Sequence, residues 1–132
     1  LLGPERTKSV YPHRSLLDSG VRLSFGSDYP GEPFYEPLRG IDLAVNRDSK
    51  ERITVEEALA CYTRESAYAE RRESSKGSIT PGKLADFVVL SDDPLSIPAT
   101  DMGKLRVVQT IVGGETVYAA ETLAEIKPGG DV

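Results

Sequence analysis

The sequence has 132 residues, enough for one domain with its own core but too few for a complete large barrel of roughly 250 residues. Its net charge of −5 and the lack of a Lys/Arg cluster argue against a nucleic-acid-binding protein. A lone cysteine, Cys61, excludes a disulfide framework within the chain, and we interpret it as a small core residue.

Two features bear on the origin and location of the chain. No apolar run approaches the length of a membrane span and no basic, apolar leader opens the sequence, so we expect a soluble, cytoplasmic protein without a membrane partner. The sequence begins with Leu1 rather than Met, which favours a truncated or processed product.

The first predicted elements are a short helix over residues 13–19 and a strand over residues 21–26. Pro12 suits the first turn of the helix, and Gly20 is placed where a helix ends. The next residues alternate between apolar and polar, which is the pattern of a strand. The apolar ones are Val21, Leu23 and Phe25. A helix followed so closely by a strand is typical of α/β proteins.

A sharp corner follows the predicted strand, with the sequence Gly26-Ser27-Asp28-Tyr29-Pro30. Gly26 lets the backbone turn, and Pro30 prevents the chain from continuing in a sheet. Parallel α/β proteins place catalytic or metal-binding carboxylates just past the end of a buried strand. An Asp before a turn also commonly accepts hydrogen bonds from the next backbone amides as an Asx-turn. The pattern alone leaves both roles of Asp28 open.

Two longer helices are predicted in the middle of the chain. A loop over residues 31–37, rich in Pro and aromatic residues, is either the wall of a pocket or a rigid connector. The broad apolar face of residues 37–46 predicts a helix. Thr54 and Glu57 have the spacing of a capping box, which predicts the start of a helix over residues 54–71.

The last third of the chain has the pattern of an antiparallel sheet. Small residues and a Pro-Gly turn over residues 74–83 end the helical part. Strands are predicted over residues 85–90, 106–112 and 115–118, with Gly113-Gly114 as a hairpin turn. Residues 121–132 have the composition of a frayed tail. Two or three strands with apolar faces are marginal alone, so this sheet needs partners that the chain does not obviously contain.

These motifs, in this order, resemble the C-terminal third of an amidohydrolase-superfamily enzyme. The resemblance is to the subgroup of YtcJ-like proteins and N-substituted formamide deformylases, and it covers residues 2 to about 118. Its strongest parts are the corner at Asp28 and the run Gly77-Ser78-Ile79-Thr80-Pro81-Gly82-Lys83-Leu84-Ala85-Asp86.

The resemblance implies a metal-dependent hydrolase with a (β/α)₈ TIM barrel and a small β-sandwich, a composite domain built from both chain termini. Residues 1–75 would be the end of the barrel, with barrel strand eight near residues 21–26. Residues 76–120 would be part of the sandwich, and residues 121–132 a tail. The fold class expected for the chain is therefore α/β, as the last strand–helix units of the barrel plus part of the sandwich.

The resemblance also implies a role for Asp28 as a ligand of the catalytic divalent metal, expected to be zinc, and as the catalytic group that takes a proton from the metal-bound water. Such a metal lowers the pKa of its water, which then attacks the carbonyl of a small amide-type substrate and breaks a non-peptide carbon–nitrogen bond. The other metal ligands of the family are absent from this sequence. His13 is expected to be a surface or packing residue.

One carboxylate cannot make a zinc site that needs roughly three or four protein ligands. We therefore expect the chain alone to be inactive. Tyr29, Pro30, Phe34 and Tyr35 either line the mouth of the substrate site or form a plain loop, and the substrate-binding residues stay unidentified. An alternative function is a stand-alone, non-catalytic module or truncated remnant that forms homo-oligomers through the edges of its sheet.

Overall fold

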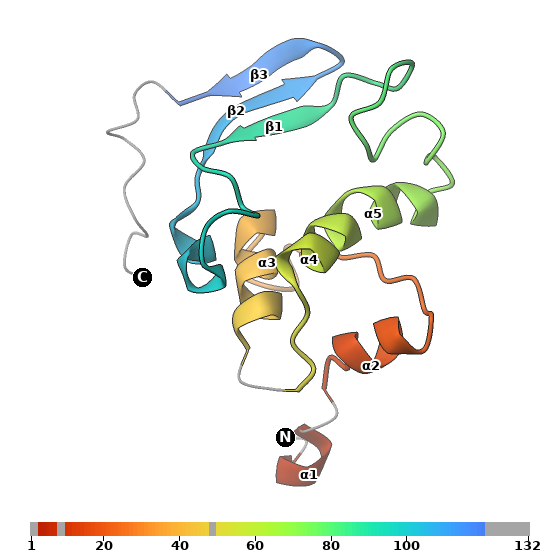
Figure 1. Ribbon diagram of the computed structural model, residues 1–132, viewed down its shortest axis with the longest axis vertical. Coiled ribbons are helices and arrows are strands. Elements are labelled where there is room, and N and C mark those ends of the chain that lie inside the picture. The colour runs from red at the N-terminus through yellow and green to blue at the C-terminus, as the bar shows by residue number, and fades with distance from the viewer. Residues whose placement is uncertain (1–2, 8–9, 48–49, 121–132) are drawn as a thin grey trace.

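The chain folds into a helical half and a three-stranded sheet, shown in Figure 1 by a computed structural model that describes residues 3–7, 10–47 and 50–120. The predicted tail, residues 121–132, lies outside the described residues. The helices and strands, in chain order, are α1 (Gly3–Thr7), α2 (His13–Asp18), α3 (Pro37–Asn46), α4 (Val55–Tyr62), α5 (Arg64–Ala69), β1 (Phe87–Leu90), the 3₁₀-helix η1 (Ala99–Lys104), β2 (Val107–Val112) and β3 (Glu115–Ala119).

The hydrophobic core lies where α3, α4 and η1 meet. On α3, Ile41, Ala44 and Val45 are buried, at the three- and four-residue spacing of one helix face. Met102 of η1, which is fully buried, packs in the same cluster. The sequence analysis did not predict η1, because its residues show no apolar period. Burial of Met102 ties the chain between β1 and β2 back onto the helical half.

The helix predicted over residues 54–71 is wrong as a single element, because it is broken at Thr63 into α4 and α5. The backbone of Thr63 has φ −118° and ψ −91°, outside the helical range. In a continuous helix the carbonyl of Cys61 would accept the N–H four residues later. It accepts instead the N–H of Phe25 at 3.1 Å and the hydroxyl of Ser66 at 2.7 Å. A long-range contact therefore ends α4, which local sequence signals do not reveal.

The strand predicted over residues 21–26 is not a strand in this structure. The described strands pair only with one another, in the order β1-β2-β3, so this segment has no ladder partner among the described residues. The predicted alternation survives in part, since Leu23 and Phe25 are half-buried while Arg22 and Ser24 are exposed. Val21, which the pattern places on the inner side, is exposed.

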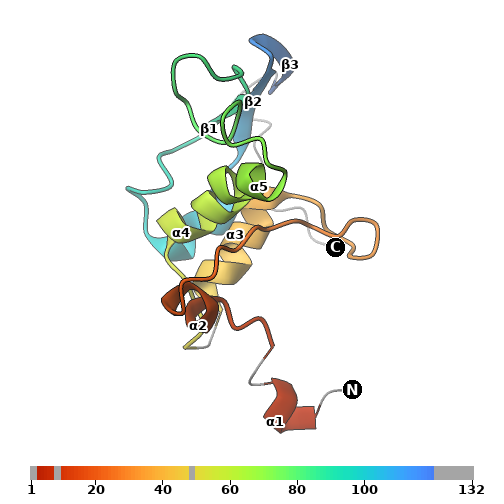
Figure 2. The same ribbon diagram turned by 90° about the vertical axis from the view of Figure 1, so that its right-hand side faces the viewer.

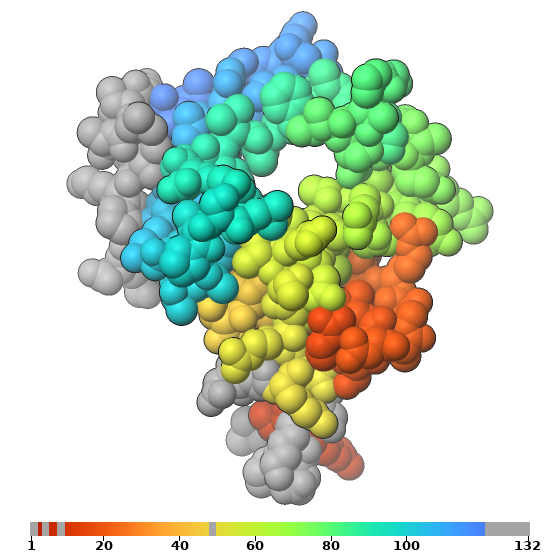
Figure 3. All heavy atoms as spheres, viewed as in Figure 1, coloured from red at the N-terminus to blue at the C-terminus, as the bar shows by residue number. Residues whose placement is uncertain are grey.

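The sheet is an antiparallel meander. The β2–β3 turn has φ 60° at Gly113 and 85° at Gly114, both left-handed as a type I′ hairpin requires and as the Gly-Gly pair predicts. In Figures 1 and 2 the sheet stands apart from α2–α5, and Figure 3 shows an opening between them. Six large apolar residues of the strands are exposed: Phe87, Val88, Val89, Val112, Val117 and Tyr118.

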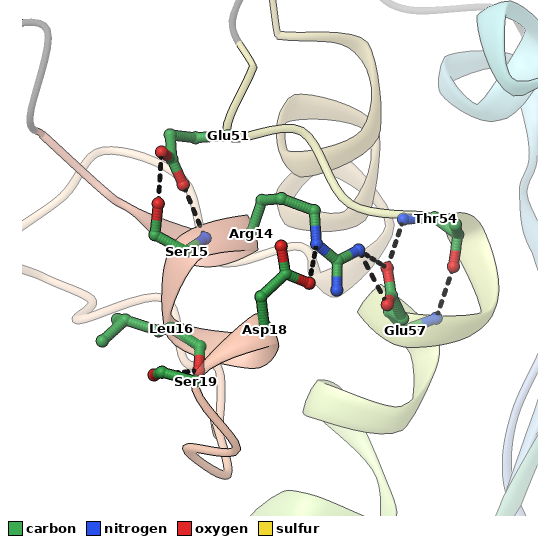
Figure 4. A network of polar contacts seen from close by, with 8 residues as sticks. All are labelled: Arg14, Ser15, Leu16, Asp18, Ser19, Glu51, Thr54 and Glu57. Atoms are coloured by element: carbon green, nitrogen blue, oxygen red, sulfur yellow. Dashed lines mark hydrogen bonds and ion pairs between the residues drawn. The ribbon is translucent and has the colours of Figure 1, made fainter.

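Helix α2 has no buried residue, and it is held to the helical half largely by polar contacts (Figure 4). Arg14 Nη1 donates to both carboxylate oxygens of Glu57 at 2.8 Å. The backbone N–H and the hydroxyl of Ser15 donate to Glu51 at 2.8 and 2.7 Å. Glu57 also completes the predicted capping box with Thr54.

Both acceptor carboxylates of this network have a lowered pKa. Hydrogen bonds from the hydroxyl and N–H of Ser15 lower the pKa of Glu51. Burial pushes the pKa of Glu57 upward, but hydrogen bonds from Thr54 and Arg14 outweigh it and the net pKa lies below the usual value. A carboxylate whose pKa is depressed by folding stabilises the fold above its unfolded-state pKa, and this stabilisation is lost as the pH falls through the folded-state pKa.

We therefore expect acid to weaken the fold through these two residues. The melting temperature, followed by circular dichroism, should fall as the pH drops below about 4.5, the usual pKa of Glu. In the double variant Glu51→Gln/Glu57→Gln this fall should be smaller. The exposed neighbour Glu56, changed to Gln, is the control and should follow the unmodified chain. An equal fall in the double variant would contradict the expected role of the network.

Candidate functional site

Asp28 lies at a tight turn with a left-handed backbone, φ 55°. Its carbonyl accepts the N–H of Gly31 at 2.7 Å and the N–H of Glu32 at 3.3 Å, so the chain reverses direction there. The Tyr29–Pro30 peptide bond is cis. Asp is among the residues that tolerate this backbone region, which suits it to the corner.

The carboxylate of Asp28 is exposed and accepts no hydrogen bond from any described residue. The side chain that accepts a turn amide is that of Ser27, whose Oγ bonds the N–H of Tyr29 at 3.3 Å. Pro30 has no N–H, and the amides of Gly31 and Glu32 donate to the Asp28 carbonyl, so the Asx-turn alternative for Asp28 is wrong in this structure. A Cβ at Gly31 would approach the Asp28 carbonyl to 2.9 Å and Oδ2 to 3.1 Å. Glycine at position 31 thus leaves room for the carboxylate.

An open groove of about 670 Å³ lies beside this corner, and Asp28 itself is not among its lining residues. The segment before the corner forms one wall, and α3 with the loop preceding it forms another. Of the four residues predicted to line a substrate mouth, only Phe34 lines this groove. Tyr29 and Tyr35 instead pack edge to face, with ring centroids 5.5 Å apart.

Aromatic rings and cations gather in this groove. The guanidinium of Arg39 lies 3.4 Å from the ring centroid of Phe34, a cation–π contact. His13, Phe25 and Tyr62 form a chain of rings with centroids 4.9 and 5.5 Å apart. The groove therefore has a largely aromatic wall.

His13 packs against Phe25, as expected for a packing residue, and it also lines the groove, which the sequence analysis missed. Burial and the nearby charge of Arg47 lower the pKa of His13, although Glu51 acts in the opposite direction. Its Nδ1 is buried and has no hydrogen-bond partner within the described chain. No signal in a single sequence separates this histidine from a surface one.

The metal-binding capacity of the described residues is limited. They contain no group of three or more His, Cys, Asp or Glu side chains that could hold a metal ion. Asp28 offers one free carboxylate, so the described part of the chain does not form a metal site by itself. Cys61 is buried, and burial raises the pKa of its thiol, which fits a core residue rather than a nucleophile. Within the described residues, no helix has the length and apolar character needed to cross a bilayer.

Comparison with known proteins identifies the family of this chain. A family model described as "Amidohydrolase family" matches residues 1–118. The chain is 37% identical to the putative amidohydrolase YtcJ of Bacillus subtilis over 89% of its own length and 24% of that protein. It is 38% identical to the N-substituted formamide deformylase of Arthrobacter pascens, over 83% of the chain and 21% of that enzyme.

A solved structure is similar as well. The chain resembles a metal-dependent hydrolase from Pyrococcus furiosus with a TM-score of 0.62 and 40% identity, over 71% of the chain and 20% of that protein. The chain thus spans about a quarter or less of the length of these relatives. The match to the family description over most of the chain, together with these identities, shows that the chain belongs to the amidohydrolase family.

Proposed function

We propose that this chain is the C-terminal portion of a metal-dependent amidohydrolase that hydrolyses non-peptide carbon–nitrogen bonds in small amide-type substrates. One observation carries the proposal: the Asp28 carboxylate lies at a sharp corner, exposed and without a hydrogen bond from the described residues. A carboxylate that is left without a partner at a built turn is available for a ligand or a proton. It lies within the segment that matches the family.

In this proposal residues 1–75 are the end of a (β/α)₈ barrel and residues 76–120 belong to a β-sandwich. The segment over residues 21–26, which joins no sheet among the described residues, supports the first part, because its alternating side chains suit a strand whose ladder partners lie outside this chain. The exposed apolar residues of β1, β2 and β3 support the second, because a sheet with an apolar face buries that face against another layer.

Asp28 would be one ligand of a divalent metal, proposed to be zinc, and the proton acceptor of the site. The name of the Pyrococcus furiosus relative, a metal-dependent hydrolase, supports a metal. Since the described residues contain no group of three or more side chains that could hold a metal ion, the remaining ligands would come from outside the chain. The name of the Arthrobacter pascens relative supports small N-substituted amides as the substrate class.

The experiment that tests this function uses the complete protein that contains this sequence. We expect the purified complete protein to release amine from N-formyl or N-acyl amines, to lose this activity in a chelator and to regain it with zinc. Residues 1–132 alone, assayed in parallel with and without zinc, should show no turnover. Turnover by the isolated chain, or a complete protein that hydrolyses no amide with any divalent metal, would contradict the proposal.

A second candidate is a non-catalytic module that associates with copies of itself. The exposed apolar strands favour it, because unpaired edges of a sheet invite strand addition. Light scattering on the 132-residue chain at several concentrations separates the two candidates when it is combined with the assay above. A stable oligomer with no larger native form in the source cell would support the module.

A further inference from the structure

The segment that ends in Asp28 is attached to the body by few apolar contacts. We refer to residues 10–28 as the strap. The structure describes all of these residues, and none of them is fully buried. Leu17 and Phe25 pack only partly against the core cluster. The position of the strap therefore depends in large part on its polar contacts.

The first of these contacts is an N-terminal cap supplied from a distant part of the chain. Pro12, the N-cap residue of α2, makes no side-chain cap hydrogen bond. The N–H of Ser15 lies in the first turn, where a helix provides no partner of its own. Glu51, only 4% exposed and 36 residues further along the chain, accepts that N–H at 2.8 Å and the Ser15 hydroxyl at 2.7 Å. Figure 4 shows both oxygens of Glu51 directed at Ser15.

The second contact is an ion pair next to the first. Arg14 Nη1 donates to Glu57 Oε1 and Oε2, both at 2.8 Å, while its Nε donates to Asp18 at 2.8 Å. Glu57 lies in the first turn of α4, and its other hydrogen bond, from the N–H of Thr54, holds it in place. Together Glu51 and Glu57 fix both the position and the rotation of α2.

Further hydrogen bonds hold the rest of the strap in place, from the end of α2 toward Asp28. The N–H of Val21 donates to the carbonyl of Leu16 at 3.0 Å, which ties the exit of α2 to the helix. Further along, Arg22 donates to Glu65 at 2.6 Å, and the N–H of Phe25 donates to the carbonyl of Cys61 at 3.1 Å. Phe25 lies three residues before Asp28.

We propose that Glu51, assisted by the Arg14–Glu57 pair, is a positioning residue that caps α2 from a distance and thereby holds the strap and its Asp28 corner in place. The consequence for chemistry rests on the proposed function of Asp28, whereas the positioning of the strap does not. Loss of the cap would release the strap from a body whose own core, at α3, α4 and η1, stays intact.

Amide hydrogen exchange, measured by NMR on the 132-residue chain, tests the positioning. In Glu51→Ala the N–H groups of Val21 and Phe25 should exchange about tenfold faster, because a hydrogen-bonded attachment is lost. The N–H of Ala58, which donates to the Thr54 carbonyl in α4, should keep its rate. Unchanged exchange at Val21 and Phe25, or an equal increase at Ala58, would overturn the proposal.

Two further variants keep the test independent of a general loss of stability. Glu51→Gln should restore most of the protection, since the amide oxygen accepts the Ser15 N–H and the amide NH₂ donates to Ser15 Oγ. Arg14→Ala removes the second contact and leaves both residues of the capping box, Thr54 and Glu57, in the chain, and it should accelerate exchange at Val21. If the N–H groups of Val21 and Phe25 exchange as fast in Glu51→Gln as in Glu51→Ala, the hydrogen bonds of the cap do not hold the strap.

The chemical consequence is measured separately in the complete hydrolase. Glu51→Ala should weaken the binding of zinc, and Glu51→Gln should restore it, when all variants are assayed at a temperature well below their melting transitions. If Asp28 is not a metal ligand, the exchange results will stand while zinc affinity does not change. The two failures are thus distinguishable. If the positioning is wrong, the exchange rates of Val21 and Phe25 do not change in Glu51→Ala.

Discussion

With the function proposed above, Asp28→Asn in the complete protein is expected to lower kcat for amide hydrolysis by about 10²–10⁴-fold, the usual contribution of a general acid or base. Asn has nearly the same size as Asp, and it also tolerates the left-handed backbone of φ 55°, so the corner should keep its shape. The neutral amide oxygen is a weaker metal ligand than a carboxylate, and it cannot hold the proton. The measurement is steady-state kinetics with the zinc content of each sample determined.

Glu56→Gln is the matched control for this substitution, because it removes one exposed carboxylate from α4 and leaves the residues of the Asp28 corner unchanged. Its kcat should equal that of the unmodified enzyme. Circular dichroism should give the same spectrum and melting temperature for both variants. Near-normal turnover in a folded, metal-loaded Asp28→Asn enzyme would remove Asp28 from the mechanism.

Elements with local signals could be predicted from the sequence. The capping box at Thr54 and Glu57 starts α4 in the structure, and Gly113-Gly114 makes the predicted hairpin turn. α3 has the predicted bounds because Pro37 starts it and an apolar face with helical spacing follows. In each of these cases the residues that determine the element lie within a few positions of one another.

Elements that depend on distant residues could not be predicted. The break at Thr63 arises because Phe25 and Ser66 take the carbonyl of Cys61, and no local pattern shows this. α2 is capped by Glu51, although its own N-cap position holds Pro12. The period-two pattern over residues 21–26 predicts side-chain alternation, but pairing requires a second strand, which the described residues do not provide.

Some features of the candidate site likewise have local signals in the sequence, whereas others depend on the tertiary fold. The position of Asp28 at a sharp turn after an alternating segment could be inferred from the sequence. The freedom of its carboxylate also depends on the amides of Gly31 and Glu32, which donate to the Asp28 carbonyl instead, and the sequence does not show this. The place of His13 in the groove wall depends on Phe25 and on α3, and is likewise a product of the tertiary fold.

Gly77 begins the second of the two motifs that carry the family resemblance, residues 77–86. The structure gives a physical reason for a glycine at this position. Its backbone has φ +90°, a region that other residues rarely adopt. A Cβ at this position would lie 2.6 Å from the Cβ of Ala67 and 3.0 Å from the Cα of Arg64. Both neighbours belong to α5, and Ala67 is buried, so neither can move away easily. Glycine thus lets the chain leaving the helical half pack directly on α5.

Gly77→Ala is therefore expected to lower the free energy of unfolding of the chain by about 3 kcal/mol, from the left-handed backbone and from overpacking together. Gly82→Ala separates the two causes. Gly82 has nearly the same φ, +91°, but no atom lies within 4 Å of the position that a Cβ would take, so this variant should lose only about 1 kcal/mol. Urea unfolding followed by circular dichroism gives both values.

A double-mutant cycle then tests the contact itself. Ala67→Gly alone should destabilise α5 by about 1 kcal/mol, because glycine is a poor helix former. Combined with Gly77→Ala it should relieve the overlap of the two Cβ atoms, so the double variant should be more stable than the sum of the single changes predicts, by about 1–2 kcal/mol. Equal losses for Gly77→Ala and Gly82→Ala, with no coupling to position 67, would show that backbone conformation alone requires glycine in this motif. A clear coupling would mean that the motif keeps glycine so that the chain entering the sheet can pack against α5.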